Sequence, residues 1–318
     1  MIDALSLFGG LIYLLMGGDL LVRGAAALSH RARVPPIVVG LTVVAFGTSA
    51  PELVVGVQSV LVGHPGLALG NVVGSNIANI LLVVGIPAII APLVCDEPAI
   101  ARDTAVMLAT SVLFVVLCVL GPLGRIDATV LLIGLVFFVV FNFREARAGQ
   151  KRPPEPGELE RVLGLPHRRA MIALFLVIGI VMLPLGASLL IEGASAIATR
   201  FGISEAVIGL TIIAIGTSLP ELATTLAAAF QHHADVALGN VIGSNVINLL
   251  AIMGVAALLS PEPIPVPDAF LRLDLPVMIG AALALSLFTL RRAPIGRRAG
   301  ILLTAGYGIY LLALVITG

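Results

Sequence analysis

The sequence predicts an all-α polytopic membrane protein of ten transmembrane helices, arranged as two inverted five-helix repeats. Three observations lead to this fold class. Hydrophobic residues make up 59% of the 318 residues and charged residues 11%, whereas a soluble domain has about 25% charged residues. Apolar segments long enough to cross a bilayer recur along the chain, and motifs of the first half return in the second half. These observations exclude a soluble globular protein.

The apolar segments divide the chain into ten predicted spans. Each is long enough to cross a bilayer core, which takes about 17–25 residues of helix. Between Arg33 and Asp96, only Glu52 and His64 are acidic or basic among 62 positions. The predicted spans cover residues 5–27, 36–62, 67–92, 104–121, 126–143, 170–192, 205–230, 236–259, 273–290 and 299–317.

A polar segment, residues 144–169, separates two groups of five spans. It is rich in Pro, Glu and Arg, and we expect it to be a linker between a first repeat, 1–143, and a second repeat, 170–318. Fifteen of the Lys and Arg residues fall on the side of the membrane that holds the linker, and 3 on the other side. By the positive-inside rule, the linker is predicted to be cytoplasmic and both termini to lie outside.

Two motifs recur at a common offset of 169 residues. The segment GLTVVAFGTSAPEL (40–53) matches GLTIIAIGTSLPEL (209–222) at 10 of 14 positions, and ALGNVVGSNIANI (68–80) matches ALGNVIGSNVINL (237–249) at 9 of 13. The common offset indicates an internal duplication. Because each repeat has an odd number of spans, the second repeat enters the membrane from the opposite side. Such inverted repeats are typical of secondary transporters.

Each GTS-P-E motif is predicted to break a transmembrane helix, in spans 2 and 7. Pro51 cannot donate a hydrogen bond to the carbonyl of Gly47, and we expect the carbonyl groups near Ala45 and Ala214 to lose helical partners. Within a bilayer, such a backbone is tolerated only where it faces protein or lines a polar cavity. A simple proline kink is the alternative, but it does not account for the carboxylate beside each break.

These two carboxylates, Glu52 and Glu221, are predicted to bind a cation. A charge in mid-span costs at least ~2.5–3.5 kcal/mol, and the central parts of these spans and of their neighbours contain no Arg or Lys. A protonated or ion-paired glutamate is the alternative. Further side-chain oxygens in the same motifs come from Thr48, Ser49, Thr217, Ser218, Ser75, Ser244, Asn79 and Asn248. A site made of oxygens alone suits Ca²⁺ and Na⁺ and does not suit Zn²⁺ or copper.

Other polar residues receive other interpretations. Asn71 and Asn240 begin the same polar stripes and are candidate helix caps. Asp103, Asp127 and Asp274, near span ends, are expected to lie at the membrane interface. The spans contain no nucleophile–base pair and no histidine metal site, so we predict no enzyme, no cofactor, and neither a nucleic-acid nor an obligate protein partner. A channel is disfavoured, because polar residues cluster only in mid-membrane.

The paired motifs resemble the two α-repeats of the cation/Ca²⁺ exchanger superfamily, and in particular its prokaryotic sodium/calcium exchanger branch. The resemblance implies a secondary active antiporter that exchanges Ca²⁺ for Na⁺ by alternating access, in the inner membrane of a prokaryote. Ca²⁺/H⁺ exchange, or exchange of K⁺ or Mn²⁺, is the alternative. In that family the two glutamates bind Ca²⁺ and share the Na⁺ sites. Carried over, the ligands are Glu52, Glu221, the hydroxyl residues named above and the carbonyl oxygens of Ala45 and Ala214.

One position departs from the family pattern. Typical members have an Asn at the position of Asn79 and an Asp at that of Asn248, whereas both are Asn in this chain. The site therefore has one titratable carboxylate fewer, which leaves the stoichiometry and the choice between Na⁺ and H⁺ open. Spans 1 and 6 contain glycine-rich segments and no predicted ligand, so we expect them to be the moving elements.

Overall fold

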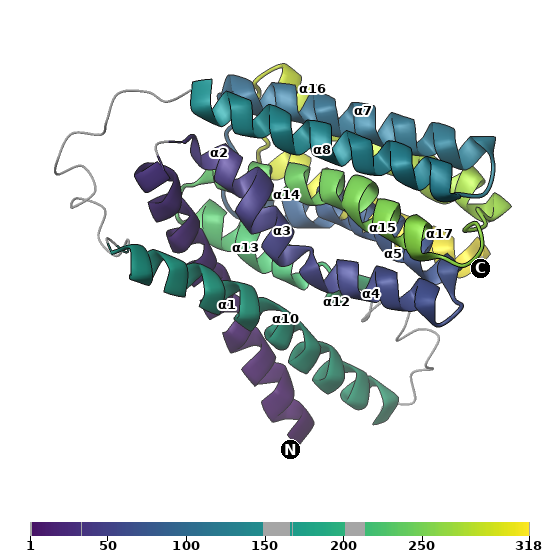
Figure 1. The fold of residues 1–318 in the computed structure, drawn as a ribbon. Coiled ribbons are helices and arrows are strands. Elements are labelled where there is room, and N and C mark those ends of the chain that lie inside the picture. The colour runs from purple at the N-terminus through teal and green to yellow at the C-terminus, as the bar shows by residue number, and fades with distance from the viewer. Residues whose placement is uncertain (1, 33, 149–165, 167, 201–213, 318) are drawn as a thin grey trace.

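The computed structural model describes residues 2–32, 34–148, 166, 168–200 and 214–317, and these residues are almost entirely helical (Figure 1). Two isolated backbone pairs, Leu93 with Ile295 and Leu123 with Ile264, join loops within these ranges. The α-helices are α1 (Ile2–Ala32), α2 (Pro36–Val39), α3 (Ala45–Thr48), α4 (Ala50–Leu61), α5 (Pro65–Ala78), α6 (Gly85–Ile90), α7 (Pro98–Leu120), α8 (Arg125–Ala148), α10 (Arg169–Arg200), α12 (Ala214–Gly216), α13 (Leu219–Phe230), α14 (Ala234–Ile247), α15 (Met253–Leu259), α16 (Leu275–Leu290) and α17 (Arg297–Thr317). The π-helical segments are η1 (Gly40–Val44), η2 (Asn79–Val84), η4 (Asn248–Ile252) and η5 (Phe270–Asp274).

The predicted helical membrane architecture is confirmed. In the described part of the chain, seven helices are long and apolar enough to cross a membrane, and the bent pair Pro36–Thr48 with Ala50–Leu61 makes eight. The predicted span 7 is described only from Ala214 onward, because 201–213 lie outside the described residues. The predicted span 10 corresponds to α17, which does not belong to that group of eight. The count of ten spans therefore stays a prediction.

The spans that carry the GN-GSN motifs form the interior of the molecule. The run α14–η4–α15 and the run α5–η2–α6 are buried over most of their length, whereas α1, α8 and α10 expose most of theirs. Apolar side chains of the outer helices can face lipid, but polar groups inside a membrane require protein or water as neighbours. The inner runs are therefore the place where polar side chains can gather.

Helices α1 and α10 lie side by side along one flank of the molecule (Figure 1). Glycines on each helix lie against the backbone of the other. A Cβ atom on Gly10 would lie 2.6 Å from the carbonyl oxygen of Gly186, and one on Gly179 would lie 2.9 Å from that of Gly17. Small residues allow membrane helices to approach this closely, so the glycines of predicted spans 1 and 6 serve to pack the two helices together.

The first GTS-P-E motif bends its span by 46° between α3 and α4. Ser49 lies at the bend with φ −84° and ψ 5°, and Ser218 of the second motif has φ −88° and ψ 5°. Pro51 and Pro220 are each the second residue of the helix that follows. A proline there forfeits no helical hydrogen bond, since the first N–H groups of a helix have no partner. The serine at the bend thus adopts the same backbone conformation in both copies of the motif.

Candidate cation-binding site

Glu52 and Glu221 lie in the first turns of α4 and α13, and each residue is 1% exposed. Each follows the serine at its bend by three residues. In a first turn, a carboxylate is close to backbone N–H groups without helical partners and to the positive end of the helix dipole. The bends therefore lower the free-energy cost of burying these two carboxylates.

Side chains from the two halves of the chain meet at these bends. The Ser49 hydroxyl donates to Oε1 of Glu221 at 3.2 Å, and the Thr48 hydroxyl donates to Oδ1 of Asn240 at 3.2 Å. The fold therefore places polar groups of the first GTS-P-E motif against those of the second half.

Asn71 and Asn240 hold the backbone beside the two glutamates. The side-chain amide of Asn71 donates to the carbonyl oxygen of Glu52 at 3.3 Å, and that of Asn240 donates to the carbonyl oxygen of Glu221 at 3.5 Å. The expectation that they cap helices is wrong, because both residues lie within helices, α5 and α14. The missed signal was their common offset, which makes each asparagine the partner of the glutamate in its own half.

The remaining predicted side-chain ligands on the inner helices are also buried. Ser75, Ser244, Asn79 and Asn248 are each at most 4% exposed. Asn79 and Asn248 each begin a π-helical segment, η2 and η4, and such segments are frequent at functional sites. Asn79 also donates to Oδ1 of Asn245 at 3.2 Å. The sequence motifs did not reveal these π-helical segments.

Several buried polar atoms of this cluster have no hydrogen-bond partner in the protein. They are Oε2 of Glu52, Oε2 of Glu221, Oγ of Ser218, Oγ of Ser244, Oδ1 of Asn79, and both side-chain polar atoms of Asn76 and Asn248. Buried polar atoms are normally hydrogen-bonded, and an unsatisfied one requires an explanation such as an ion or a water molecule. Most of these atoms are oxygens, so the cluster has free ligand capacity for a cation.

Three predicted ligands differ from the others in their surroundings. The Ala45 carbonyl accepts hydrogen bonds from the Ser49 N–H at 3.0 Å and the Thr48 hydroxyl at 3.3 Å. The expectation that it loses its helical partner is wrong, because the N–H group four residues later is still present. Thr217 is only half-buried. Ala214 begins α12, directly after residues outside the described part of the chain.

The chemistry of the cluster is that of an oxygen site. Among the described residues, no group of three or more His, Cys, Asp and Glu side chains could hold a metal ion. The polar groups that meet beside the two carboxylates in the described residues are hydroxyl and amide groups, and no described Cys or His forms a metal-binding group with them. Hard cations prefer such ligands, whereas Zn²⁺ and copper prefer nitrogen and sulfur.

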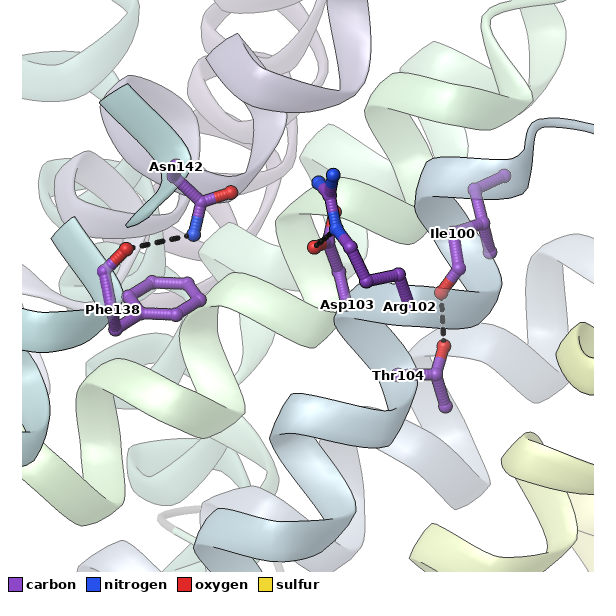
Figure 2. A network of polar contacts seen from close by, with 6 residues as sticks. All are labelled: Ile100, Arg102, Asp103, Thr104, Phe138 and Asn142. Atoms are coloured by element: carbon purple, nitrogen blue, oxygen red, sulfur yellow. Dashed lines mark hydrogen bonds and ion pairs between the residues drawn. The ribbon is translucent and has the colours of Figure 1, made fainter. Parts of the chain in front are cut away.

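Asp103 and Asp274, expected at the membrane interface, are both buried within the protein. Asp103 is 0% exposed and forms an ion pair with Arg102 at 2.9 Å, and Figure 2 shows the two side chains together on α7. The Arg102 guanidinium also lies 5.0 Å from the centre of the Phe141 ring. Asp274, 6% exposed, accepts a hydrogen bond from the Tyr310 hydroxyl at 2.6 Å. Neither aspartate is left without a partner.

The fold and the cluster define a polytopic helical membrane protein with buried carboxylate, hydroxyl and amide groups at its centre. The sequence profile of the family described as "Sodium/calcium exchanger protein" matches residues 3–144 and 171–316. The chain belongs to this sodium/calcium exchanger family.

Relatives and a solved structure resemble the chain over nearly its whole length. Inner membrane protein YrbG of Escherichia coli is 36% identical over 96% of this chain and 94% of its own. Sodium/calcium exchanger MaX1 of Methanosarcina acetivorans is 32% identical over 98% of both chains. The sodium-calcium exchanger NCX_Mj, soaked with 2.5 mM Na⁺ and 0.1 mM Ca²⁺, superposes with a TM-score of 0.84 at 32% identity over 99% of both chains.

Proposed function

We propose that the protein is a secondary active antiporter that exchanges Ca²⁺ for Na⁺ across the inner membrane of a prokaryote. One observation carries this proposal: Glu52 and Glu221 are both buried, and side chains of the two halves join beside them. No described Arg or Lys forms an ion pair with either glutamate. Two buried carboxylates without a basic partner require a cation, and one relative with a similar sequence is named a sodium/calcium exchanger.

Ca²⁺ and Na⁺ are the substrates, and they compete for the same oxygens. The proposed ligands are Glu52, Glu221, Thr48, Ser49, Thr217, Ser218, Ser75, Ser244, Asn79, Asn248 and the carbonyl oxygens of Ala45 and Ala214. Ca²⁺ takes six to eight oxygen ligands, and the unpartnered oxygens of the cluster support such a site. Two carboxylates balance one Ca²⁺ or are shared among Na⁺ ions. Exclusive occupancy by one kind of ion couples the two fluxes.

Ca²⁺/H⁺ exchange is the second candidate. Asn79 and Asn248 supply amides where the family pattern has one Asp, so fewer carboxylates share the charge of bound Na⁺ ions. Protons on the two glutamates could replace Na⁺ as the coupling ions. Another relative, CaxA of Alkalimonas amylolytica, 37% identical over 91% of this chain, is named only a putative antiporter.

We further propose ten spans in two inverted repeats, 1–143 and 170–318, joined by the cytoplasmic linker 144–169. The matching conformations of Ser49 and Ser218 support the duplication. The loop contacts support the inversion. Leu93 pairs with Ile295 and Leu123 with Ile264, and in the proposed topology each pair lies on one side of the membrane, cytoplasmic and extracellular respectively.

Alternating access requires one pair of helices to move against the rest, and α1 with α10 is the proposed pair. At the proposed cytoplasmic side, α1 covers α13. A Cβ atom on Gly18 would lie 2.8 Å from the Ala223 carbonyl oxygen, and Gln231 donates to Oδ1 of Asp19 at 2.9 Å. On α4 the position equivalent to Ala223 is Val54, which is 54% exposed. The contact of α1 with Ala223 and the exposure of the equivalent Val54 together support a state that is closed toward the cytoplasm.

The test is ⁴⁵Ca²⁺ uptake into proteoliposomes, driven in separate experiments by an outward Na⁺ gradient and by a pH gradient. We expect uptake with the Na⁺ gradient, and its loss in Glu52→Gln and Glu221→Gln variants that still fold. If only the pH gradient drives uptake, the coupling ion is H⁺ and not Na⁺. Wild-type rates in both variants would refute the proposed site.

A further inference from the structure

Asn245 contacts one of the proposed ligands but is not itself one of them. It lies on α14 and is 2% exposed. Its Oδ1 accepts a hydrogen bond from the side-chain amide of Asn79 at 3.2 Å, and its Nδ2 donates to the sulfur of Met107 on α7 at 3.5 Å. Met107 is fully buried. A chain of two side-chain hydrogen bonds therefore runs from α7 through α14 and ends at a proposed ligand.

The sulfur of Met107 fixes the orientation of the Asn245 side chain. A thioether sulfur accepts a hydrogen bond and cannot donate one, so the nitrogen of the Asn245 amide faces the sulfur. The nitrogen and the oxygen of a side-chain amide lie on opposite sides of one planar group. The oxygen of Asn245 is thereby left for Asn79. A leucine at position 107 would fill a similar volume but would not select one orientation of the amide.

Asn245 fixes the orientation of Asn79 in the same way. Because Oδ1 of Asn245 is an acceptor, Asn79 presents its nitrogen to it, and Oδ1 of Asn79 faces away. That oxygen is buried and has no hydrogen-bond partner among the described residues. An unsatisfied buried oxygen is explained by an ion or a water molecule. The reverse orientation would present N–H groups, which repel a cation, so the orientation of this amide affects cation binding.

A second set of the same three residue types, exchanged between the halves, lacks these hydrogen bonds. At the offset of 169, the counterparts of the two linked asparagines are Asn76 and Asn248. The segment DLPVM (274–278) resembles DTAVM (103–107), so the counterpart of the methionine is Met278. Both polar side-chain atoms of Asn76 and of Asn248 are without a partner in the described part of the chain. The chain of hydrogen bonds is therefore formed by only one of the two sets.

We propose that Met107 and Asn245 are positioning residues that orient the Asn79 side chain with its oxygen toward the bound cation. Asn245 acts through Asn79, and Met107 acts through Asn245. Asn79 is thus a ligand whose orientation is set before the cation arrives, which lowers the free-energy cost of binding. The amide of Asn248 is oriented only when the cation binds. The inference rests on the proposed function, because it assigns further residues to the same cation site.

The test is equilibrium binding of ⁴⁵Ca²⁺ to the purified full-length protein in nanodiscs, without a Na⁺ gradient. Asn245→Leu keeps a similar side-chain volume and removes the acceptor for Asn79. The dissociation constant for Ca²⁺ should increase by about fivefold, the effect of one hydrogen bond between neutral groups. In Na⁺-driven uptake, the Ca²⁺ concentration at half-maximal rate should increase by the same factor. The maximal rate should stay unchanged, which a general loss of packing would not produce.

Met107→Leu tests the first hydrogen bond of the chain with little change in volume. The dissociation constant for Ca²⁺ should increase by about twofold, the lower end for one hydrogen bond, because a thioether is a weak acceptor. The matched control is Met278→Leu, the same substitution at the counterpart, which is 1% exposed. It should leave the dissociation constant unchanged. Equal binding in the two leucine variants would overturn the inference, even if Asn245→Leu does not fold.

A double-mutant cycle separates positioning from packing. If Asn245 acts through Asn79, Asn245→Leu should have no further effect on Ca²⁺ binding in an Asn79→Ala background, whereas an independent effect on packing would add to it. Additive effects would overturn the inference and leave the proposed function intact. The same conclusion follows from wild-type binding in an Asn245→Leu variant with a wild-type melting temperature. Wild-type binding in Glu52→Gln would instead refute the proposed function, and this inference with it.

Discussion

Replacing Ser49, the residue directly before α4, by alanine should weaken Ca²⁺ binding more than loss of the Ser59 hydroxyl within α4. Ser49 lies at the bend, and its hydroxyl donates to Oε1 of Glu221 in the other half of the chain. Oε2 of the same carboxylate has no partner in the protein. The alanine variant therefore removes a contact that both orients Glu221 and joins the two halves at the proposed site.

The geometry of this contact sets the expected magnitude. A hydrogen bond to a charged group contributes about 1.5–3 kcal/mol, which corresponds to about 10- to 150-fold in affinity. The Ser49–Glu221 distance of 3.2 Å is longer than the 2.5–2.7 Å of a strong O–H···O⁻ bond. We therefore expect the effect of Ser49→Ala to lie at the lower end of this range of affinities. The Ca²⁺ concentration at half-maximal uptake should increase by about tenfold.

The matched control is Ser59→Ala within α4, the helix that directly follows Ser49. The Ser59 hydroxyl donates to the Val55 carbonyl oxygen at 2.8 Å, away from the carboxylates, and the residue is 7% exposed. The assay is Na⁺-driven ⁴⁵Ca²⁺ uptake as a function of external Ca²⁺, with melting temperatures of both variants. Equal effects of the two substitutions, or a change below threefold in Ser49→Ala, would refute the reasoning.

Three further predictions concern packing, charge and a buried hydrogen bond. Gly18→Ala should shift the protein away from the cytoplasm-closed state, because the new Cβ would lie 2.8 Å from a backbone oxygen of α13 and overpacking costs about 1–3 kcal/mol. The rate of hydrogen exchange in α13 should therefore rise. The control Gly9→Ala, whose new Cβ would have nothing within 4 Å, should leave that rate unchanged. Asn248→Asp should lower the Ca²⁺ concentration at half-maximal uptake by about tenfold, because ligand charge sets Ca²⁺ affinity, and an unchanged value would place Asn248 outside the site. Tyr310→Phe should lower the free energy of unfolding by about 1.5–3 kcal/mol, because Asp274 loses a donor at 2.6 Å; a wild-type melting temperature in detergent would contradict this.

The two glutamates could be predicted from the sequence because a bilayer penalises every charge that it contains. Glu52 is one of two acidic or basic residues in 62 positions, and its copy at Glu221 makes a chance occurrence implausible. The helix break could also be predicted from the sequence, because the effect of Pro51 on a helix is local. Such features depend on short-range chemistry, so they need no knowledge of the packing.

The roles of the asparagines could not be predicted in this way. An asparagine inside a transmembrane helix can cap, pack or bind, and the spacing of Asn71 and Asn240 is compatible with each role. Their distances to the carbonyl oxygens of Glu52 and Glu221 separate these roles. The burial of Asp103 was also not predictable from the sequence, because it depends on how α7 packs against other helices.

The amino-acid sequence alone determined the class of protein, the duplication and the two carboxylates, because these follow from composition, a fixed offset and the cost of charge in hydrocarbon. Which atoms meet depended on the packing of helices that are distant in the chain. Ser49 and Glu221 are 172 residues apart, and no local rule sets the distance between them. The same holds for the close approach of Gly10 to Gly186, which depends on how the two long helices α1 and α10 pack against each other.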